Sequence, residues 1–493
     1  MTPSTHPSTA IHVLFVTAEI APWVKTGGLG DVSAALPPAL ARAGCEVRVL
    51  VPAYPALKAA FPQAQPLIEV PGLALRLPPC RILDAGPLAD GARLLLLDSE
   101  SRFARPGNPY QDPHGNGWPD NGLRFGLLSR VAHWLADNGN LVGWRTDVVH
   151  CNDWHAALVP AFRSFLGGGR PSIVTIHNLA FQGLFGPELL GELGLPGHAF
   201  RYDGVEFHGK LSFLKAGLQL AERVTTVSPN YAAEIQTPEF GAGLDALLRH
   251  RAEELSGILN GIDLNEWNPE RDPHIAASYG LATLPRKALN KAALQRRLGL
   301  TVDPSVPLIG VVSRMTHQKG SDLIIQAAED LLTLGYQLAI LGAGDHRIEK
   351  AFSDLTHRHP HRVVTLIGYE ESLAHQIEAG ADMFLMPSLF EPCGLNQMYS
   401  LRYGTPPIVR RTGGLADTVT DTVPDSIAGQ RATGFVFDEP TAGALVAAAA
   451  RALDAWRQPE LWRSLQERGM SKEFGWNDAA LRYIEVYLEA MQA

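Results

Sequence analysis

The sequence predicts an α/β protein made of two doubly wound domains, and three observations carry that prediction. The chain has 493 residues, too many for one ordinary hydrophobic core, so two or three domains are expected. In both halves, strand-like segments alternate with helix-like segments, as in parallel sheets covered by helices. This alternation stops near Asn260 and resumes after about Pro285. We expect domains at residues 1–259 and 260–472 that face a common cleft, and a helix at 473–493 packing back on the first domain.

In the first half, the predicted strands are short apolar segments bounded by turn residues. Val13–Thr17 is an apolar run of the kind buried on both faces of a parallel sheet. A Pro- and Gly-rich stretch at 102–121 predicts a long loop. The other strands are Glu46–Val51, Arg93–Leu97, Asp147–Cys151, Ser172–Ile176, Arg223–Val227 and Gly257–Leu259, with helices at Phe125–Asp137, Ala156–Leu166 and Lys210–Ala221 between them.

The second half repeats this pattern after an irregular segment. A helical tail, rich in Ala, Leu, Trp and Glu, is predicted from about Leu445 to Ala493. The predicted strands are Leu308–Ser313, Gln337–Leu341, Val363–Leu366, Met383–Pro387 and Pro407–Val409, with helices at Asp322–Leu334 and Ser372–Ala379.

The amino-acid composition indicates which binding partners and which cellular compartment to expect. The net charge of −9 argues against a general nucleic-acid binder, which would show a basic footprint. The four cysteines are scattered and form no CxxC pair, so neither a disulfide framework nor a cysteine metal site is expected. Residues 1–10 lack the features of a signal peptide, and no apolar run is long enough for a membrane span. We expect a cytoplasmic protein with no nucleic-acid or membrane partner.

The segment KTGGLGDV, which begins at Lys25, predicts an anion-binding site. It follows the first strand and leads into a helix with Val32, Leu36 and Leu40 on one face. Glycines let the backbone approach a phosphate, and a helix N-terminus presents unpaired N–H groups. Because Lys25 precedes the glycines, the pattern is neither a Walker A motif nor a dinucleotide fingerprint. A tight structural turn explains the glycines about as well.

Polar residues follow two neighbouring strands of the first half. Asn152-Asp153-Trp154-His155 comes after one strand, and His177-Asn178 comes after the next. A doubly wound sheet places its ligand site at these strand ends. Each histidine alone reads as a structural residue, but two clusters at consecutive strand ends favour a site.

The second half offers a second set of charged residues at strand ends. Arg314 follows the Leu308–Ser313 strand, and Lys319-Gly320 precede a helix, which suggests a second phosphate cradle. Ordinary surface charges are the alternative. Glu391 lies in PSLFEPCGLNQ, where Gly394 is expected to open a helix, and this carboxylate could equally serve the helix dipole. A glycine turn with the letters TGGL recurs at Thr412.

Seven motifs in order resemble the family of bacterial glycogen synthases and plant starch synthases, and the resemblance covers nearly the whole chain. The first motif and FEPCGL are quite specific, and the others are supportive. The motifs are KTGGLGDV, NDWHA, TIHN, LNGID, the Arg314 and Lys319-Gly320 pair, FEPCGLNQ and RTGGLADT.

This resemblance implies a two-domain Rossmann-like glycosyltransferase of the GT-B fold. It implies transfer of glucose from ADP-glucose to the non-reducing end of an α-1,4-glucan in glycogen biosynthesis, with retention at the anomeric carbon and release of ADP. No metal or other cofactor is expected. Carried over by position, the resemblance implies these catalytic residues: Glu391, Asp153, His177, Arg314 and Lys319. Substrate binding falls on Lys25, Gly28, Asn178, Asn260, Tyr369, Cys393, Gly394, Leu395, Thr412 and Gly413.

In the roles that the resemblance implies, Arg314 and Lys319 hold the pyrophosphate and Lys25 contacts the donor or its phosphates. Tyr369 lies against the adenine, and Glu391 binds the transferring sugar. These roles agree with the chemistry, because fixed cations must meet the charge of a leaving diphosphate when no metal does so. A carboxylate also stabilises an oxocarbenium-like centre. We favour front-side attack, and a covalent glycosyl-enzyme stays open.

One position departs from the wider glycosyltransferase pattern. Many relatives carry a second glutamate eight residues after the first, where it binds the ribose, and here that position is Tyr399. Glycogen synthases share this departure, which leaves the ribose contact unassigned. Two other readings remain, namely a different two-domain enzyme, such as an epimerase or a transferase for another acceptor, and a non-catalytic glucan- or nucleotide-binding protein. A phosphorylase is disfavoured, because no pattern suggests a pyridoxal-phosphate lysine.

Overall fold

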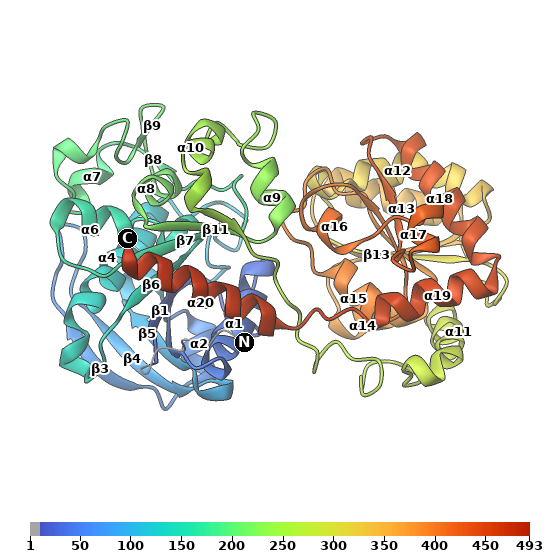
Figure 1. Ribbon diagram of the computed structural model, residues 1–493, viewed down its shortest axis with the longest axis horizontal. Coiled ribbons are helices and arrows are strands. Elements are labelled where there is room, and N and C mark those ends of the chain that lie inside the picture. The colour runs from blue at the N-terminus through green and yellow to red at the C-terminus, as the bar shows by residue number, and fades with distance from the viewer. Residues whose placement is uncertain (1–9) are drawn as a thin grey trace. The chain divides into compact units, whose positions relative to one another are not determined.

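The computed structural model describes residues 10–493, so the N-terminal segment in which no signal peptide is expected lies almost wholly outside the described residues (Figure 1). The described chain forms two compact units. The first unit comprises Met1–Gly261, as far as it is described, together with Trp476–Ala493, and the second unit is Ile262–Gly475. Both units contain a sheet with parallel strands and covering helices, which confirms the predicted α/β class.

The main sheet of the first unit has nine strands in the order β12-β11-β7-β6-β1-β2-β5-β4-β3. β1 lies at its centre and pairs in parallel with β2 and β6, so that Val13 lies opposite both Val47 and Val148. Residues 13–16 of β1 are fully buried, as an apolar central strand requires. The strands are β1 (His12–Val16), β2 (Glu46–Pro52), β3 (Gln65–Val70), β4 (Cys80–Pro87), β5 (Arg93–Asp98), β6 (Val148–Asn152), β7 (Ser172–Ile176), β11 (Arg223–Thr226) and β12 (Leu255–Gly257).

Three details of the first unit differ from the sequence prediction. Strands β3 and β4 were not predicted, and they run antiparallel at one edge, where β3 is mostly exposed and lacks a buried apolar pattern. Lys210–Ala221 is not one helix, because Lys210–Ser212 form strand β10 and the Ser212 hydroxyl then caps helix α8. The last strand ends at Gly257 rather than beginning there. A second sheet, in the order β8-β10-β9, contains β8 (Leu184–Phe185), β9 (Glu206–Phe207) and β10.

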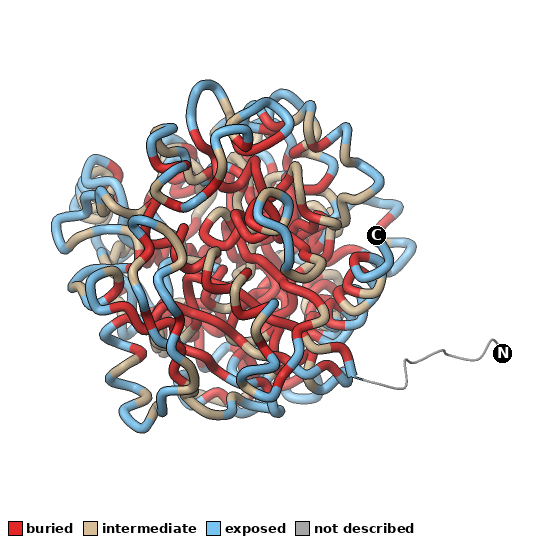
Figure 2. The backbone as a smooth tube through the Cα atoms, turned by 90° about the vertical axis from the view of Figure 1, so that its left-hand side faces the viewer, coloured by how far each residue is buried: buried red, intermediate tan, exposed pale blue. Residues whose placement is uncertain are grey.

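Helices of the first unit cover the sheet, and the last helix of the chain is one of them. α20 (Trp476–Gln492) packs on α1, and the Tyr487 hydroxyl lies 2.8 Å from Nδ1 of buried His150 in β6 (Figure 1). Figure 2 shows the buried residues gathered inside this unit and the exposed ones on its outer loops. The other helices are α1 (Gly28–Arg42), α2 (Pro55–Ala60), α3 (Glu100–Phe103), α4 (Asn121–Asn138), α5 (Asp153–Ala156), α6 (Val159–Leu166), α7 (Leu189–Glu192), α8 (Phe213–Leu220), α9 (Pro229–Glu234) and α10 (Asp245–His250).

The second unit has a six-stranded sheet in the order β15-β14-β13-β16-β17-β18, and every neighbouring pair is parallel. Its core packs α12 and α18 on this sheet through residues such as Ile309, Ala327 and Leu445. The strands are β13 (Leu308–Val312), β14 (Gln337–Gly342), β15 (Val363–Ile367), β16 (Met383–Met386), β17 (Pro407–Arg410) and β18 (Phe435–Phe437), of which β18 was not predicted.

The tail from Leu445 is helical, as predicted, and it consists of three helices, α18, α19 and α20.

Across residues 10–493, no helix combines the length and apolar character that crossing a membrane would require. The helices of the second unit are α11 (Lys287–Leu298), α12 (Ser321–Thr333), α13 (His346–Arg358), α14 (Glu371–Gly380), α15 (Asn396–Arg402), α16 (Gly413–Thr418), α17 (Pro424–Ala428), α18 (Ala442–Trp456) and α19 (Pro459–Met470).

Candidate functional site

The loop between β1 and α1 carries Lys25 at the carboxyl edge of the first sheet, and Gly28 is the first residue of α1. The Lys25 ammonium lies 2.7 Å from Oδ1 of Asp31 in the first turn of α1, and its side chain is 42% exposed. A Cβ atom added at Gly27 or Gly28 would meet no atom within 4 Å. The loop backbone therefore borders open space, where a ligand can approach it closely.

A buried carboxylate that the sequence analysis missed, Glu19, holds this loop. Its Oε2 accepts a hydrogen bond from the Thr26 backbone N–H at 2.7 Å, and its Oε1 accepts from the Thr26 hydroxyl at 2.6 Å. The Tyr110 hydroxyl also donates to Oε1, from the long loop at 102–121. Glu19 thus ties the glycine loop to a segment about ninety residues away, a contact that no local sequence signal reveals.

Asp153 occupies a strained position directly after β6. It has a φ of +55° and is 6% exposed, and its Oδ1 accepts backbone hydrogen bonds from His177 at 2.9 Å and Asn178 at 3.4 Å. Burial raises the pKa of Asp153 to about 7, a shift that the charge of Glu19 increases and the two N–H donors oppose. Such a carboxyl changes protonation state near neutral pH. The structure therefore brings together Asp153, His177 and Asn178, as the strand-end argument predicted.

Two more of the predicted polar residues in the first unit are His177 and Asn260. Nε2 of His177 lies 2.9 Å from Oδ1 of Asn152, and burial lowers the His177 pKa to about 3, so the ring is neutral at physiological pH. Asn260 is 6% exposed, and its Oδ1 has no hydrogen-bond partner among residues 10–493. A buried amide oxygen without a partner is costly, and a ligand hydroxyl would satisfy it.

His155, the other strand-end histidine, is part of an aromatic cluster. It is 4% exposed, stacks on Tyr110 with 4.8 Å between ring centroids, and meets Phe125 edge-on. These contacts favour the structural role over a catalytic one. Next to this cluster lies a pocket of about 420 Å³, and its lining residues are Trp154, Ala180, Phe181, Gln182, Gly183 and Leu184.

In the second unit, Lys319 and Glu391 form an ion pair. The Lys319 ammonium donates to Oε2 of Glu391 at 2.6 Å, and the Ser388 hydroxyl donates to the same oxygen at 3.0 Å. The side chains of Glu391 and Lys319 are 6% and 18% exposed, so water screens the pair only weakly. The structure thus joins two predicted residues and adds Ser388, which the sequence analysis did not single out.

Two glycines allow the close backbone contacts that build this arrangement. A Cβ atom at Gly320, next to Lys319, would lie 2.1 Å from the carbonyl oxygen of Pro387. A Cβ atom at Gly413 would lie 1.9 Å from the carbonyl oxygen of Glu391. Both glycines have positive φ angles, +69° and +43°. Only glycine fits these sites, so the recurring TGGL turn positions the loop that carries Glu391.

Two predicted residues of the second unit are exposed at strand ends. Arg314 follows β13, and among the described residues its side chain forms no ion pair. Tyr369 follows β15, is 64% exposed, and donates its hydroxyl hydrogen to Oε2 of Glu371. An exposed cation and an exposed aromatic ring can contact a phosphate and a base, respectively.

The remaining predicted residues surround the Glu391 loop. Cys393 is buried, and α15 begins at Asn396, two residues later than the predicted start at Gly394, so that Leu395 precedes the helix. Thr412 precedes α16 and Gly413 begins it. Tyr399 is 8% exposed, and its ring stacks on Trp267 with 3.8 Å between the ring centroids. The Tyr399 ring therefore has a packing role.

Two family models match the chain, one in each unit. The model for the starch synthase catalytic domain matches residues 12–250, and the model for glycosyl transferases group 1 matches residues 299–469.

Bacterial relatives are similar over nearly the whole chain. A protein of Dechloromonas aromatica (strain RCB), called glycogen synthase, is 55% identical over 484 residues, which cover 98% of this chain and 99% of that protein. A glycogen synthase of Aromatoleum aromaticum is 50% identical over 491 residues, covering 99% of both chains.

Solved structures show the same architecture. The catalytic domain of starch synthase IV from Arabidopsis thaliana, bound to ADP and acarbose, is 33% identical, with a TM-score of 0.88 over 98% of this chain and all of that one. Sucrose-phosphate synthase from Thermosynechococcus elongatus is 18% identical, covers 98% of this chain and 99% of its own, has a TM-score of 0.59, and shares the fold alone.

Proposed function

The chain belongs to the glycogen synthase family of glycosyltransferases, and from this membership we propose that it transfers glucose from ADP-glucose to the non-reducing end of an α-1,4-glucan, with retention of configuration. In this reaction the bond between C1 of glucose and the diphosphate oxygen breaks. A bond forms between C1 and the 4-hydroxyl oxygen of the acceptor, and ADP leaves. We favour front-side attack, in which the acceptor proton passes to the departing phosphate oxygen.

The paired Lys319 and Glu391 are the observation that carries this proposal. A leaving diphosphate gains negative charge, and the glucosyl centre gains positive charge. The diphosphate therefore needs a cation beside it, and the glucosyl centre needs an anion. Lys319 supplies the cation and Glu391 the carboxylate. Arg314, exposed at the end of β13, adds a second cation for the diphosphate. We propose that these cations meet the charge of the leaving group, so that the transfer itself needs no metal ion or other cofactor.

The first unit supplies groups for the sugar and the acceptor in this proposal. Neutral His177 and the orphaned Asn260 amide can hydrogen-bond sugar hydroxyls, and the open space at Gly28 leaves room for the donor. The pocket beside Trp154 and Phe181 has the aromatic and apolar lining on which glucose rings stack. We assign the glucan acceptor to this pocket.

We also place the reaction in the cytoplasm. All four cysteines are buried and none forms a disulfide, which fits a reducing compartment. The net charge of −9 gives no support to a nucleic-acid partner. The partners we propose are therefore ADP-glucose and the glucan.

The test is an activity panel of donors and acceptors. Purified protein with ADP-glucose and glycogen should release ADP and lengthen the glucan by α-1,4-linked glucose, and UDP-glucose should be a poorer donor. Absence of ADP release with every nucleotide sugar would refute the proposal. An isomerised sugar nucleotide without a growing glucan would indicate an epimerase, and nucleotide binding without turnover would indicate a binding protein.

A further inference from the structure

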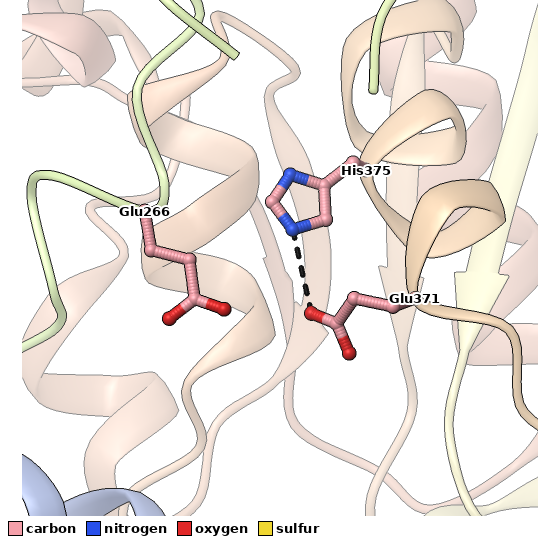
Figure 3. A group of neighbouring side chains, drawn as sticks. All are labelled: Glu266, Glu371 and His375. Atoms are coloured by element: carbon pink, nitrogen blue, oxygen red, sulfur yellow. Dashed lines mark ion pairs between the residues drawn. The ribbon is translucent and has the colours of Figure 1, made fainter. Parts of the chain in front are cut away.

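Three side chains of the second unit converge on one point away from the Lys319–Glu391 pair. Glu371 and His375 lie one turn apart on α14, and Glu266 reaches toward them from the segment that precedes α11 (Figure 3). One ligand atom from each lies within 4.8 Å of the other two. Two carboxylates and an imidazole form a donor set for a cation.

The imidazole of His375 is held so that one nitrogen faces this cluster. Nδ1 lies 2.8 Å from Oδ2 of Asp272, a carboxylate oxygen that also accepts from the Tyr403 hydroxyl at 2.6 Å. Because this oxygen accepts, Nδ1 carries a hydrogen, and Nε2 is the nitrogen that faces the cluster. Trp267 stacks on the ring, with 3.9 Å between centroids and 10° between planes. Metal-binding histidines are oriented by such a carboxylate on their other nitrogen.

Nε2 of His375 faces a carboxylate of the cluster from a buried position. The residue is 1% exposed, and among residues 10–493 nothing makes a hydrogen bond to Nε2. Its nearest carboxylate oxygen, Oε1 of Glu371, lies 3.4 Å away and forms an ion pair with the imidazole (Figure 3). The other oxygen of Glu371 accepts from the Tyr369 hydroxyl, so Oε1 is the oxygen directed at the imidazole. A cation at this point would bind both atoms in place of the proton that now lies between them.

The separation between two of the three ligand atoms suits a small transition-metal ion. Two ligands at about 2.0–2.1 Å from a tetrahedral Zn²⁺ ion lie about 3.3–3.4 Å apart. The separation of 3.4 Å between Nε2 of His375 and Oε1 of Glu371 agrees with that edge. Two carboxylates also balance the charge of a divalent cation. Imidazole favours Zn²⁺ or a similar ion over Mg²⁺, which prefers oxygen ligands and water.

We propose that Glu266, Glu371 and His375 bind one divalent transition-metal ion of the Zn²⁺ type, with Asp272 as the residue that orients the imidazole. Three protein ligands leave one coordination position for water. The ion joins the start of α14 to the segment that carries Glu266, so it stabilises the second unit and takes no part in the transfer reaction. The proposal does not depend on the proposed glucosyl transfer.

The test measures binding of Zn²⁺ alone to the full chain after treatment with a chelator. Isothermal titration should show one high-affinity site in the wild type. Glu266→Gln and Glu371→Gln should each weaken Zn²⁺ binding by about 10–100-fold or more. The Glu266 residue is exposed and the Glu371 side chain is 43% exposed, so the variants should fold, which circular dichroism checks. Glu270→Gln, which removes an exposed carboxylate of the same segment outside the cluster, is the matched control and should bind Zn²⁺ as the wild type does.

Co²⁺ provides a spectroscopic readout of the same site, because tetrahedral Co²⁺ absorbs strongly in the visible range. The wild type should show this absorption, and the Glu266→Gln and Glu371→Gln variants should lose it. Zn²⁺ affinity that is unchanged in either of these variants, or reduced equally in Glu270→Gln, would overturn the proposal. Absence of a stoichiometric Zn²⁺ site, or equally tight binding of Mg²⁺, would also overturn it.

Discussion

Lys319 neutralises a carboxylate that is almost fully buried, and a diphosphate would have to share this lysine with Glu391. Lys319→Ala should lower kcat by about 10²–10³-fold, because a preorganised charge opposite the leaving group is lost. It should also lower the stability of the second unit, since among residues 10–493 the Glu391 carboxylate would keep only the Ser388 hydroxyl as a partner. Initial rates of ADP release and thermal unfolding measure the two effects.

The matched control for this change is Lys350→Ala. Lys350 pairs with Asp354 on the exposed face of α13, where one ion pair contributes little to stability. This variant should keep wild-type turnover and melting temperature. Near-normal turnover of Lys319→Ala would contradict the assignment of Lys319 to the diphosphate.

Asp153 predicts a pH dependence of stability with a defined sign. Its pKa in the folded chain is about 7, against 3.8 in the unfolded chain, so between these values only the folded form holds the proton. Stability from this group is therefore lost as the pH rises from about 4 to 7, by at most about 4 kcal/mol. His177, with a lowered pKa of about 3, has the opposite slope below its ordinary value of 6.5 and masks the effect in the wild type.

Asp153→Asn isolates this contribution. Asparagine tolerates the φ of +55° as aspartate does, and its side-chain oxygen still accepts from the His177 N–H, but it does not titrate. The melting temperature of the wild type relative to this variant should fall steadily between pH 4 and pH 7. A difference that stays constant over this range would disprove the raised pKa.

At the scale of elements, short turns rather than long helices position the residues of the second unit. Gly413→Ala would drive a methyl group into the carbonyl oxygen of Glu391 at a positive φ. We expect a loss of about 1–3 kcal/mol in the free energy of unfolding and a clear fall in kcat, because the Glu391 loop must move. Unfolding curves and ADP release provide the measurement.

Gly443→Ala is the control for this substitution. Gly443 lies in the first turns of α18, and a Cβ atom there meets nothing within 4 Å. Alanine should stabilise the helix by about 0.5–1 kcal/mol and leave kcat unchanged. If both alanine variants kept full activity, the turn at Gly413 would not be what positions Glu391.

Strand ends were predictable from the sequence, and contacts between distant segments were not. The apolar runs and the polar residues after them placed Asp153, His177 and Lys319 at sheet edges, because buried parallel strands leave a clear pattern. Glu19 was not predicted as a site residue, because its partner Tyr110 lies far away in the sequence. The pairing of Ser388 with Glu391 likewise depends on how one loop folds back.

The edge strands were not predicted from the sequence, for a different reason. β3 is short of buried apolar residues, and β8 and β9 have only two residues each, so none carries the periodic signal of a strand. The hairpin of β3 and β4 also breaks the strict alternation of strand and helix on which the all-parallel prediction rested. Central strands, by contrast, agree with the prediction to within a residue or two, as β1 and β7 show.

At the scale of the whole molecule, the first unit is completed by the last helix of the chain. Tyr487→Phe should keep the packing of α20 but remove the partner of Nδ1 of buried His150. The cost should be about 1–3 kcal/mol, seen as a fall of about 2–4 °C in melting temperature for each kcal/mol, with unchanged turnover at 25 °C. Calorimetry and ADP release measure both.

Tyr202→Phe serves as the control, because this side chain is 85% exposed and its hydroxyl has little to lose. It should melt with the wild type. Equal melting temperatures for Tyr487→Phe and the wild type would show that the hydrogen bond to His150 contributes nothing, and that α20 is held by apolar contacts alone.

The late position of α20 in the sequence affects how the first unit folds during synthesis. A ribosome that has finished residue 261 must still translate residues 262–475 before Trp476 emerges. At about 5–20 residues per second, that interval lasts about 10–40 s. Throughout it, the nascent first unit exposes the apolar surface that α20 later covers, so we expect this unit to bind chaperones until α20 has been made.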